Sequence, residues 1–207
     1  MPPPIPGLIL AGGRSSRMNG PEKTLVSVAG KTLLQRVIER ARPQTDGLLL
    51  NANGDASRFA AYGLPVLPDD IDGFAGPLAG ILAGLDWLRT HRPDVRWMVS
   101  LATDTPLFPT DLVDRLYQAA QDSPEGVAIA RCDGDEQPVF GLWPVALAAD
   151  LRDALTNRGL RKMRLWTSQH HAAYADWTSA DGNDPFLNVN TPDDVAALSR
   201  ILHQMED

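Results

Sequence analysis

Short apolar runs alternate with segments of helical spacing across the first 131 residues, and this alternation restricts the fold more than any other property of the chain. The apolar runs with the length of a buried strand are 7–10, 47–51, 64–67, 97–102 and 127–131. The segments between them that predict helices are 31–42, 55–62, 77–91 and 109–121. Strands that alternate with helices predict a mainly parallel sheet with helices on both faces, joined by right-handed crossovers.

The alternation weakens after Arg131. The regular segments expected beyond it are a strand at 138–143 and helices at 145–156, 159–169 and 192–204, the last capped by Thr191. The 207 residues suit one domain, and neither an internal repeat nor a linker divides them. We therefore expect an α/β fold, a single-domain three-layer sandwich over residues 7–207, behind a proline-rich lead-in at 1–6.

Charge and cysteine content exclude several classes of function. The net charge of −7 lacks the basic footprint of a nucleic-acid-binding protein. The one cysteine, Cys132, allows neither an internal disulfide nor a cluster of cysteine ligands. No apolar run approaches the roughly 18 residues of a membrane span, and the start of the chain lacks the features of a signal peptide. The sequence therefore predicts a cytoplasmic protein that binds neither membrane nor nucleic acid.

Residues 10–23 form the segment best suited to bind an anion. They follow the first predicted strand, and open α/β sheets bind ligands beyond the carboxyl ends of their strands. Gly12 and Gly13 let the backbone approach a ligand, and Arg14, Arg17 and Lys23 add positive charge. The pattern suits a triphosphate, although a glycine turn with solvated basic side chains would have the same composition.

Two familiar phosphate-binding motifs are absent from the chain. The tripeptide Gly30-Lys31-Thr32 matches the last three residues of a Walker A motif, but Leu25 occupies the position of the motif's first glycine. No Gly-x-Gly-x-x-Gly fingerprint follows the first predicted strand. The segment at 10–23 is therefore neither an ordinary P-loop nor a typical dinucleotide-binding loop.

Short motifs along the chain occur in an order that identifies a family. The pattern Leu-Ala-Gly-Gly-x3-Arg-Met-x-Gly-x2-Lys at 10–23 resembles the signature loop of the molybdenum cofactor guanylyltransferases. Further matches follow in the expected order: Asn-Ala-Asn at 51–53, Asp69, Gly-Pro-Leu-Ala-Gly at 76–80, Thr-Asp-Thr-Pro at 103–106 and Asn-Val-Asn-Thr-Pro at 188–192. The resemblance covers nearly the whole chain after the lead-in, with Asn19 in place of a common glycine.

The resemblance implies a fold, a reaction and two substrates. Family members have the nucleotide-diphospho-sugar transferase-like fold, a Rossmann-like sandwich, and use GTP and Mg2+ to attach GMP to molybdopterin, releasing pyrophosphate. Residues 7–131 would bind the nucleotide and residues 132–207 the acceptor, and molybdoenzymes or cofactor-delivery proteins would be partners. Rival interpretations are a cytidylyltransferase for the same cofactor, a sugar-1-phosphate nucleotidyltransferase, and a GTP-binding module without catalysis.

Carried onto this sequence, the resemblance implies catalytic and metal-binding roles. Asp104, after a predicted strand, is expected to hold Mg2+, a cation that prefers oxygen ligands. Lys23, assisted by Arg17, is expected to contact the phosphates and stabilise the leaving pyrophosphate. An acceptor phosphate is already ionised at neutral pH, so the predicted reaction is an in-line displacement without a general base.

The resemblance also implies the binding positions. Those for the nucleotide are Leu10, Ala11, Gly12, Gly13, Lys23, Asn51, Asp69 and Asp104. Leu10 and Ala11 would offer backbone groups to guanine, while Asn51 would offer an amide and Asp69 a carboxylate. Local turn bonding is the alternative for Asn51 and Asp69. Asn188 and Asn190, at an expected strand end, are predicted to bind the acceptor.

Three other features have structural interpretations. The basic residues within 158–164 could hold an acceptor phosphate, but a solvated helix face is the favoured interpretation. His170 and His171 are adjacent and would face opposite sides of a strand, which disfavours a shared metal ion. Cys132 has no visible base partner in the sequence, so we expect an ordinary residue rather than a nucleophile.

Overall fold

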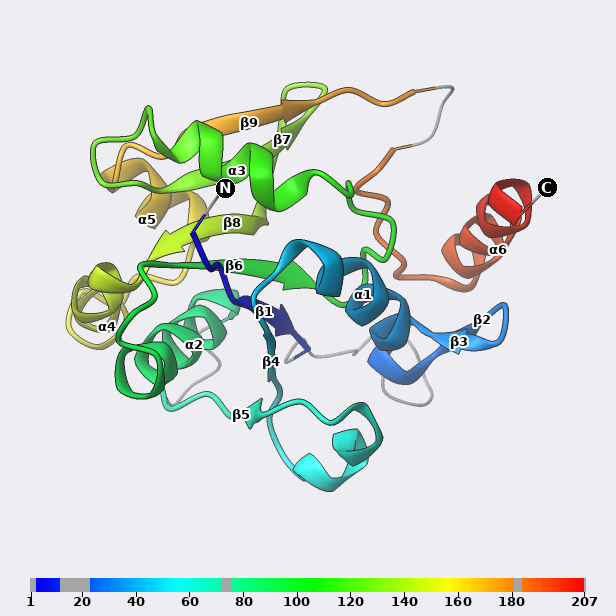
Figure 1. Cartoon of the computed structure of the whole chain (residues 1–207), viewed down its shortest axis with the longest axis horizontal. Helices are drawn as coiled ribbons and strands as arrows, with labels where there is room; N and C mark the ends of the chain where they lie inside the picture. The colour runs from blue at the N-terminus through cyan, green and yellow to red at the C-terminus, as the bar shows by residue number, and fades with distance from the viewer. Residues whose placement is uncertain (1–2, 12–22, 72–75, 181–183, 207) are drawn as a thin grey trace.

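A seven-stranded sheet forms the centre of the protein (Figure 1). The computed structural model describes residues 3–11, 23–71, 76–180 and 184–206. The strands, in the order in which they lie across the sheet, are β5 (Val66–Leu67), β4 (Leu48–Asn51), β1 (Gly7–Leu10), β6 (Trp97–Ala102), β8 (Asp135–Pro144), β7 (Ala128–Cys132) and β9 (Ala173–Trp177). β8 runs antiparallel to both of its neighbours, and the other neighbouring pairs are parallel. The predicted mainly parallel sheet is therefore confirmed.

Helices pack on both faces of this sheet. The α-helices are α1 (Leu33–Ala41), α2 (Pro77–His91), α3 (Leu112–Ala120), α4 (Ala148–Thr156), α5 (Met163–Gln169) and α6 (Pro192–Glu206). The 3-10 helices are η1 (Lys23–Leu25), η2 (Arg42–Gln44), η3 (Ala56–Tyr62) and η4 (Val145–Leu147). Side chains of α1 and α3 share one buried cluster with the strands, whereas α2, α4 and α5 share another. The protein is thus a three-layer sandwich, with α6 beside a short hairpin of β2 (Ser27–Val28) and β3 (Lys31–Thr32) (Figure 1).

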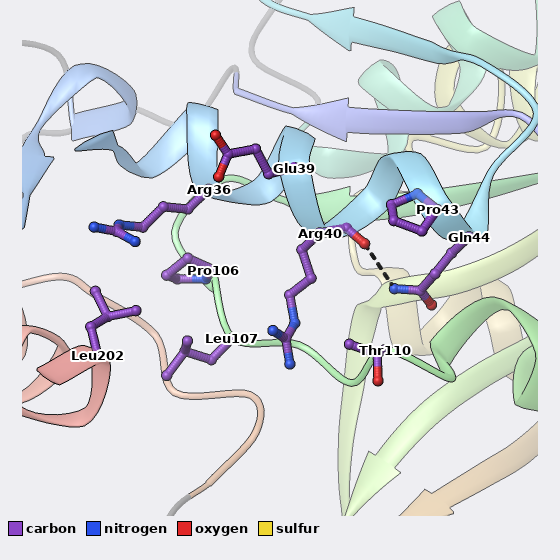
Figure 2. Close-up of a pocket in the computed structure, with 9 residues that line it drawn as sticks. All are labelled: Arg36, Glu39, Arg40, Pro43, Gln44, Pro106, Leu107, Thr110 and Leu202. Atoms are coloured by element: carbon purple, nitrogen blue, oxygen red, sulfur yellow. Dashed lines mark hydrogen bonds between the residues drawn. The ribbon is translucent and has the colours of Figure 1, made fainter. Parts of the chain in front are cut away.

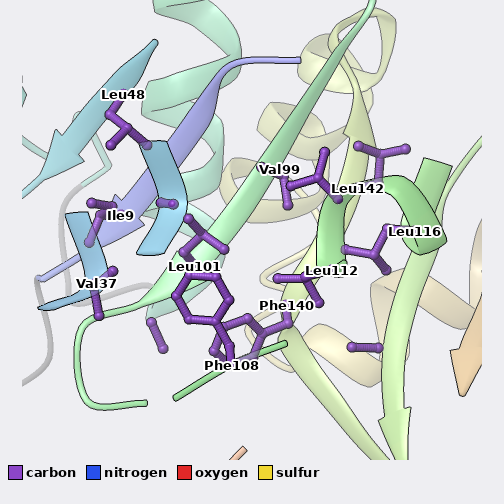
Figure 3. Close-up of a cluster of buried hydrophobic side chains, with 14 of the residues drawn as sticks. Ile9, Val37, Leu48, Val99, Leu101, Phe108, Leu112, Leu116, Phe140 and Leu142 are labelled. Carbon is purple, nitrogen blue, oxygen red and sulfur yellow. The ribbon is translucent and has the colours of Figure 1, made fainter. Parts of the chain in front are cut away.

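Each central strand contributes to both cores, because neighbouring residues of a strand point to opposite faces. In β1, Leu8 packs in the cluster of α2, α4 and α5, and Ile9 packs in the cluster of α1 and α3. In β6, Met98 packs in the cluster of α2, α4 and α5, and Val99 packs in the cluster of α1 and α3. Figure 3 shows Ile9 beside Val37 of α1 within this cluster, and Val99 on the side where Leu112 of α3 lies. Burial on both faces explains why these strands are continuous apolar runs in the sequence.

The predicted helix at 159–169 is wrong over its first four residues. α5 begins only at Met163, and Lys162 before it is extended. Gly159 has a φ of +63°, and the N–H of Leu160 donates to the carbonyl oxygen of Ala154 at 2.9 Å. This arrangement closes α4, because glycine adopts the left-handed conformation that ends a helix.

Strand β9 and the β2–β3 hairpin have no counterpart in the predictions. β9 follows the turn that holds His170 and His171, so the two histidines do not lie on a strand. The β2–β3 hairpin takes Lys31 and Thr32 from the start of the helix expected at 31–42. The Thr32 side chain instead caps α1 by accepting the N–H of Gln35 at 3.1 Å.

Several predicted boundaries hold and others move. The helix at 77–91 and the strand at 97–102 coincide with α2 and β6. The helix expected at 109–121 is shorter, since α3 spans Leu112–Ala120, and the strand expected at 138–143 is longer, since β8 spans Asp135–Pro144. Among the described residues, no helix has the length and apolar character needed to cross a membrane.

Candidate active site

Three parallel strands end side by side at one edge of the sheet. Leu10, the last residue of β1, is in register with Asn51 of β4 and Ala102 of β6. The N–H of Ala11 donates to the Asn51 carbonyl oxygen at 2.8 Å, and the hydroxyl of Thr103 donates to the Leu10 carbonyl oxygen at 3.1 Å. Ligands of open α/β sheets bind at this edge.

These backbone hydrogen bonds restrict what the end of β1 can offer to a ligand. The Ala11 N–H and the Leu10 carbonyl oxygen are both engaged within the protein. A contact from either residue to a base would therefore use another backbone group. Gly12, Gly13 and Arg17 lie outside the described residues, so their roles stay predictions.

Lys23 joins two distant segments through its ammonium group. Its Nζ lies 2.7 Å from Oδ2 of Asp104 and also donates to Oδ1 of Asn190. Lys23 precedes Asp104 by 81 residues and Asn190 by 167 residues, so the three meet only because the chain folds. The side chains of Lys23 and Asp104 are 17% and 28% exposed, so water screens their charges only in part.

Backbone hydrogen bonds hold the Asn190 segment against Asp104. The N–H of Val189 donates to the Asp104 carbonyl oxygen at 2.7 Å. The carboxylate of Asp194 accepts the N–H groups of Asn190 and Thr191, each at 2.8 Å, and the Thr191 hydroxyl accepts the Asp194 N–H at 3.2 Å. This reciprocal cap starts α6, as expected for Thr191. The hydrogen bonds from Asn190 and Thr191 lower the pKa of the Asp194 carboxyl.

Asn188 does not join this group, although the same motif contains it. Its side chain is exposed and makes no hydrogen bond with any part of the chain that the structure describes. The expectation of a strand end at Asn188 and Asn190 is wrong, because residues 184–191 contain no strand. The hydrogen bond from Val189 to Asp104 orders this segment instead. An acceptor-binding role for Asn188 stays a prediction.

A second polar group lies beyond the end of β4. Nδ2 of Asn51 donates to the Leu67 carbonyl oxygen at 3.0 Å and to Oδ1 of Asp69 at 2.9 Å. Nδ2 of Asn53 donates to Oδ2 of Asp69 at 2.8 Å, and its Oδ1 accepts the Asp69 N–H at 2.8 Å. Two amides therefore fix one carboxylate. Asn53 was not among the predicted site residues, although the Asn-x-Asn spacing could have indicated that both amides act together.

The two polar groups lie along the same edge. β1 lies between β4 and β6 in the sheet. Two strand spacings therefore separate the Asp69 group from the Lys23–Asp104 pair, a distance on the order of 10 Å. One elongated ligand could reach an anchored carboxylate at one end and a cation at the other.

Asp104 suits a metal ion that is shared with a ligand. Among residues 3–11, 23–71, 76–180 and 184–206, no group of three or more His, Cys, Asp or Glu side chains could hold a metal ion. Mg2+ usually needs only one or two carboxylates, completed by waters and substrate phosphates. The Asp104 carboxylate is partly exposed, and its Oδ1 has one long contact of 3.4 Å with the Thr105 hydroxyl. This oxygen donor fits such a cation.

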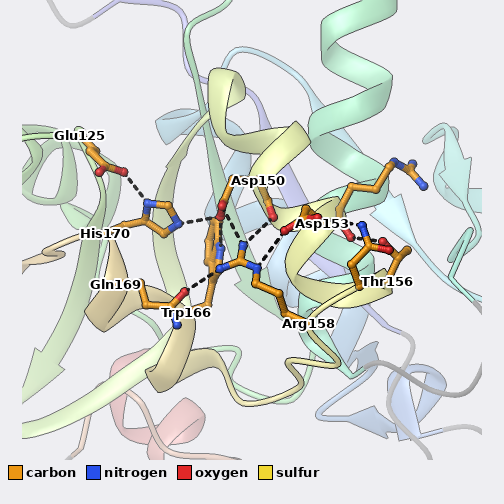
Figure 4. A network of polar contacts seen from close by, with 10 residues as sticks. Glu125, Asp150, Asp153, Thr156, Arg158, Trp166, Gln169 and His170 are labelled. Atoms are coloured by element: carbon orange, nitrogen blue, oxygen red, sulfur yellow. Dashed lines mark hydrogen bonds and ion pairs between the residues drawn. The ribbon is translucent and has the colours of Figure 1, made fainter.

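Arg158, the first residue of the basic segment at 158–164, makes structural contacts within the protein. Arg158 lies 2.7 Å from Oδ1 of Asp150. Oδ2 of Asp150 accepts the indole N–H of Trp166 at 2.8 Å and lies 2.9 Å from Nε2 of His170. Figure 4 shows Arg158 turned toward this network, which joins α4 to α5. The contacts favour the structural interpretation of Arg158 over acceptor binding.

Comparison with known proteins places the chain in a family. The model of the MobA-like NTP transferase domain matches residues 7–173. A molybdenum cofactor guanylyltransferase from Bradyrhizobium sp. (strain ORS 278) is 51% identical over 203 residues, covering 98% of this chain and 95% of that protein. The chain belongs to the molybdenum cofactor guanylyltransferase family. It is therefore a nucleotidyltransferase. This result confirms the predicted family and rejects the rival interpretation of a GTP-binding module without catalysis.

Solved structures share the fold of this family member. Molybdopterin-guanine dinucleotide biosynthesis protein A from Archaeoglobus fulgidus has a TM-score of 0.76 and 23% identity, covering 97% of this chain and 100% of that one. Rv0371c from Mycobacterium tuberculosis, solved in complex with manganese, has a TM-score of 0.69 and 21% identity, covering 95% and 98%. Likeness at these identities is evidence for the fold alone, and it confirms the nucleotidyltransferase sandwich predicted from the sequence.

Proposed function

We propose that the protein transfers GMP from GTP to molybdopterin and releases pyrophosphate, with Mg2+ as the divalent cation. The observation that carries the proposal is the convergence of Lys23, Asp104 and Asn190 at the carboxyl edge of the sheet. A carboxylate and an amide that both contact one lysine ammonium group suit phosphates that bridge a nucleotide and an acceptor. The names of relatives such as the one from Bradyrhizobium supply the nucleotide and the acceptor of the proposal.

The reaction forms one P–O bond and breaks another. A terminal phosphate oxygen of the acceptor attacks the α-phosphorus of GTP, and the bond from that phosphorus to the bridging oxygen of the β-phosphate breaks. The bridging oxygen leaves with the pyrophosphate, and the ionised acceptor needs no general base. Lys23 stabilises the negative charge that develops, with Arg17 as its expected partner. The partial burial of Lys23 strengthens this effect because water screens its charge only in part.

Asp104 would hold Mg2+ through its carboxylate, and the bound cation would neutralise charge on the phosphates. The 2.7 Å contact with Lys23 compensates the Asp104 charge. Lys23 also donates to Asn190, so this lysine lies between the proposed metal side and the proposed acceptor side. Asn190 would bind the acceptor, with Asn188 beside it.

The Asp69 group would bind the base. Guanine carries donors at N1 and N2 and an acceptor at O6, so it needs a carboxylate and a nearby donor. Each Asp69 oxygen accepts one amide, from Asn51 or Asn53. An ionised carboxylate has about four acceptor positions, so Asp69 keeps capacity for the donors of guanine. In this proposal, residues 7–131 bind the nucleotide and residues 132–207 complete the acceptor site.

Thermal unfolding with GTP, CTP and ATP, each with and without Mg2+, tests the choice of nucleotide. A ligand at about 100 times its Kd adds roughly 2.7 kcal/mol, which raises the midpoint by several degrees. We expect the largest rise with GTP and Mg2+ together. A rise with CTP alone would assign the protein to cytidylyl transfer onto the same acceptor. No rise with any nucleotide would contradict the proposed nucleotide site.

A transfer assay tests the acceptor and the role of Asp104. We expect pyrophosphate release from GTP to depend on molybdopterin and not on a hexose 1-phosphate, which a sugar nucleotidyltransferase would accept. Asp104→Asn should abolish turnover without lowering the unfolding midpoint. Asp114→Asn is the matched control, because Asp114 is an exposed carboxylate on α3. An Asp104→Asn enzyme as active as this control would refute the metal assignment.

A further inference from the structure

A pocket of about 360 Å³ lies between α1, the loop that follows β6, and α6 (Figure 2). Its volume is within the range of small-molecule sites, roughly 300 to 1,000 Å³. The lining residues that matter here are Arg36, Arg40, Pro106, Leu107, Thr110 and Leu202. Neither Lys23 nor Asp104 lines this pocket, so it is distinct from the proposed active site.

Arg40 brings a partly buried guanidinium to this pocket without a carboxylate partner. Its Nε donates to the carbonyl oxygen of Phe108, and its Nη groups have no hydrogen-bond or ion-pair partner within the described part of the chain. Burial lowers the pKa of Arg40, as expected for a cation moved from water without a counter-charge. By contrast, Arg152 lies 2.8 Å from Asp70 and 2.6 Å from Asp86.

Arg36 adds a second cation to the lining. Its guanidinium donates to the carbonyl oxygens of Val28 and Ala29, the latter at 2.9 Å, and pairs with no carboxylate of the described residues. Glu39, the acidic residue of the lining, lies 2.7 Å from Lys31 and is thereby neutralised. The pocket is therefore locally positive on a chain whose net charge is −7.

We propose that this pocket binds a small ligand that carries an oxyanion, a carboxylate or a phosphate, on an apolar body. A guanidinium binds either group through paired N–H donors, and here the Nη groups of Arg40 fill that role. The Thr110 hydroxyl is a further donor in the same lining. Pro106, Leu107 and Leu202 supply the apolar wall, and Figure 2 shows Leu107 next to the guanidinium of Arg40.

The test is a titration of the isotope-labelled full chain with phenyl phosphate and, separately, benzoate, followed by amide chemical shifts. The two probes share an apolar ring and differ in the oxyanion. We expect saturable shifts of the amides of Leu107, Phe108, Thr110 and Leu202 with at least one probe. Shifts with phenyl phosphate alone would identify a phosphate ester as the ligand class, and shifts with benzoate alone would identify an organic acid. Shifts confined to the surroundings of Lys23, or no saturable shifts, would overturn the proposal.

A pair of substitutions at Thr110 ties the binding to the charge of the pocket. Thr110→Glu adds a carboxylate to the lining that competes for Arg40, and Thr110→Gln has a similar size without the charge. Both changes are at an exposed position before α3, where an acidic residue is compatible with the helix N-terminus. We expect Thr110→Glu to weaken probe binding by about tenfold, the effect of one charge-assisted contact, and Thr110→Gln to change it little. Equal affinity in both variants would overturn the proposal.

Discussion

Gly80 of α2 lies directly against the side chain of Asn51, so that a Cβ atom at position 80 would be 2.2 Å from Asn51 Oδ1. The same atom would lie 2.7 Å from Cδ2 of Leu10. Asn51 cannot turn away freely, because its amide donates to the Leu67 carbonyl oxygen and to Asp69. A glycine at this point of α2 therefore lets the helix approach the strand ends and keeps the Asn51–Asp69 hydrogen bond in place.

We expect Gly80→Ala to weaken GTP binding by at least about tenfold, because the new methyl group displaces the Asn51 amide and with it Asp69. Overpacking costs about 1–3 kcal/mol of stability, partly offset by the roughly 1 kcal/mol helix preference of alanine over glycine. Binding is measured by titration with GTP and stability by urea unfolding. Gly84→Ala is the control, because Gly84 lies one helical turn after Gly80 in α2. A Cβ atom at position 84 would also be crowded, but by Met98 at 2.6 Å. Equal GTP affinity in both variants would show that the Asn51 geometry does not matter for binding.

Lys23 and Lys31 allow a comparison of two lysines that both form ion pairs of 2.7 Å. We expect Lys23→Gln to lower the transfer rate by about 10²- to 10³-fold, the loss typical of one preorganised donor in a partly dry site. Lys31→Gln should leave the rate unchanged, because the Lys31 and Glu39 side chains are each 46% exposed and such pairs contribute about 0–1 kcal/mol. The initial rate of pyrophosphate release measures both. If Lys23→Gln retains more than a tenth of the activity, the lysine does not stabilise the transferred charge.

The parallel half of the sheet was predictable from the sequence for a physical reason. Strands such as β1 and β6 are buried on both faces, so they are continuous apolar runs with helices between them. β9 was missed because Tyr174 and Asp176 are exposed and alternate with buried residues over only five positions. Such a short alternating segment resembles a loop until β7 provides its partner.

The candidate site was predictable as a set of segments but not as a set of contacts. Motif order placed Asp104 and Asn190 at ligand-binding positions, yet the contact of Lys23 with both depends on the fold. The same motif suggested equal roles for Asn188 and Asn190, but only Asn190 reaches Lys23. The pocket beside Arg40 could not be predicted, because α1 and α6 are far apart in the sequence and meet there only in three dimensions.

Ser100 is a buried hydroxyl of β6 that satisfies two other groups. It accepts the indole N–H of Trp143 at 2.8 Å and donates to the carbonyl oxygen of Val139. We expect Ser100→Ala to cost about 1–3 kcal/mol of unfolding free energy, because both partners would stay buried without that hydrogen bond. Urea unfolding measures the loss, and Ser168→Ala, at an exposed hydroxyl that donates to Leu165, is the control. A loss no larger than in the control would mean that water or a side-chain shift satisfies both groups.

Asp150 should make the stability of the α4–α5 contact depend on pH. Burial by itself raises the pKa of its carboxyl, but hydrogen bonds from Trp166 and His170 and the charge of Arg158 outweigh burial and hold the pKa below its ordinary value (Figure 4). A depressed pKa gives stability that is complete above the unfolded-state pKa, near 3.9, and is lost as the pH falls through the folded-state pKa.

The advantage of the wild type over Asp150→Asn should therefore be constant at neutral pH, shrink below about pH 4 and vanish once the folded-state carboxyl is protonated. Asp150→Asn keeps an oxygen that can accept the Trp166 indole N–H but removes the negative charge. The difference in unfolding free energy between the two proteins therefore measures the contribution of that charge. Unfolding free energies of both proteins from pH 2 to pH 7 measure it. Asp153→Asn is the control, because Asp153 lies 3.0 Å from the same Arg158 but bonds neither Trp166 nor His170. A difference that stays constant down to pH 2 would mean that the charge of Asp150 does not stabilise the fold.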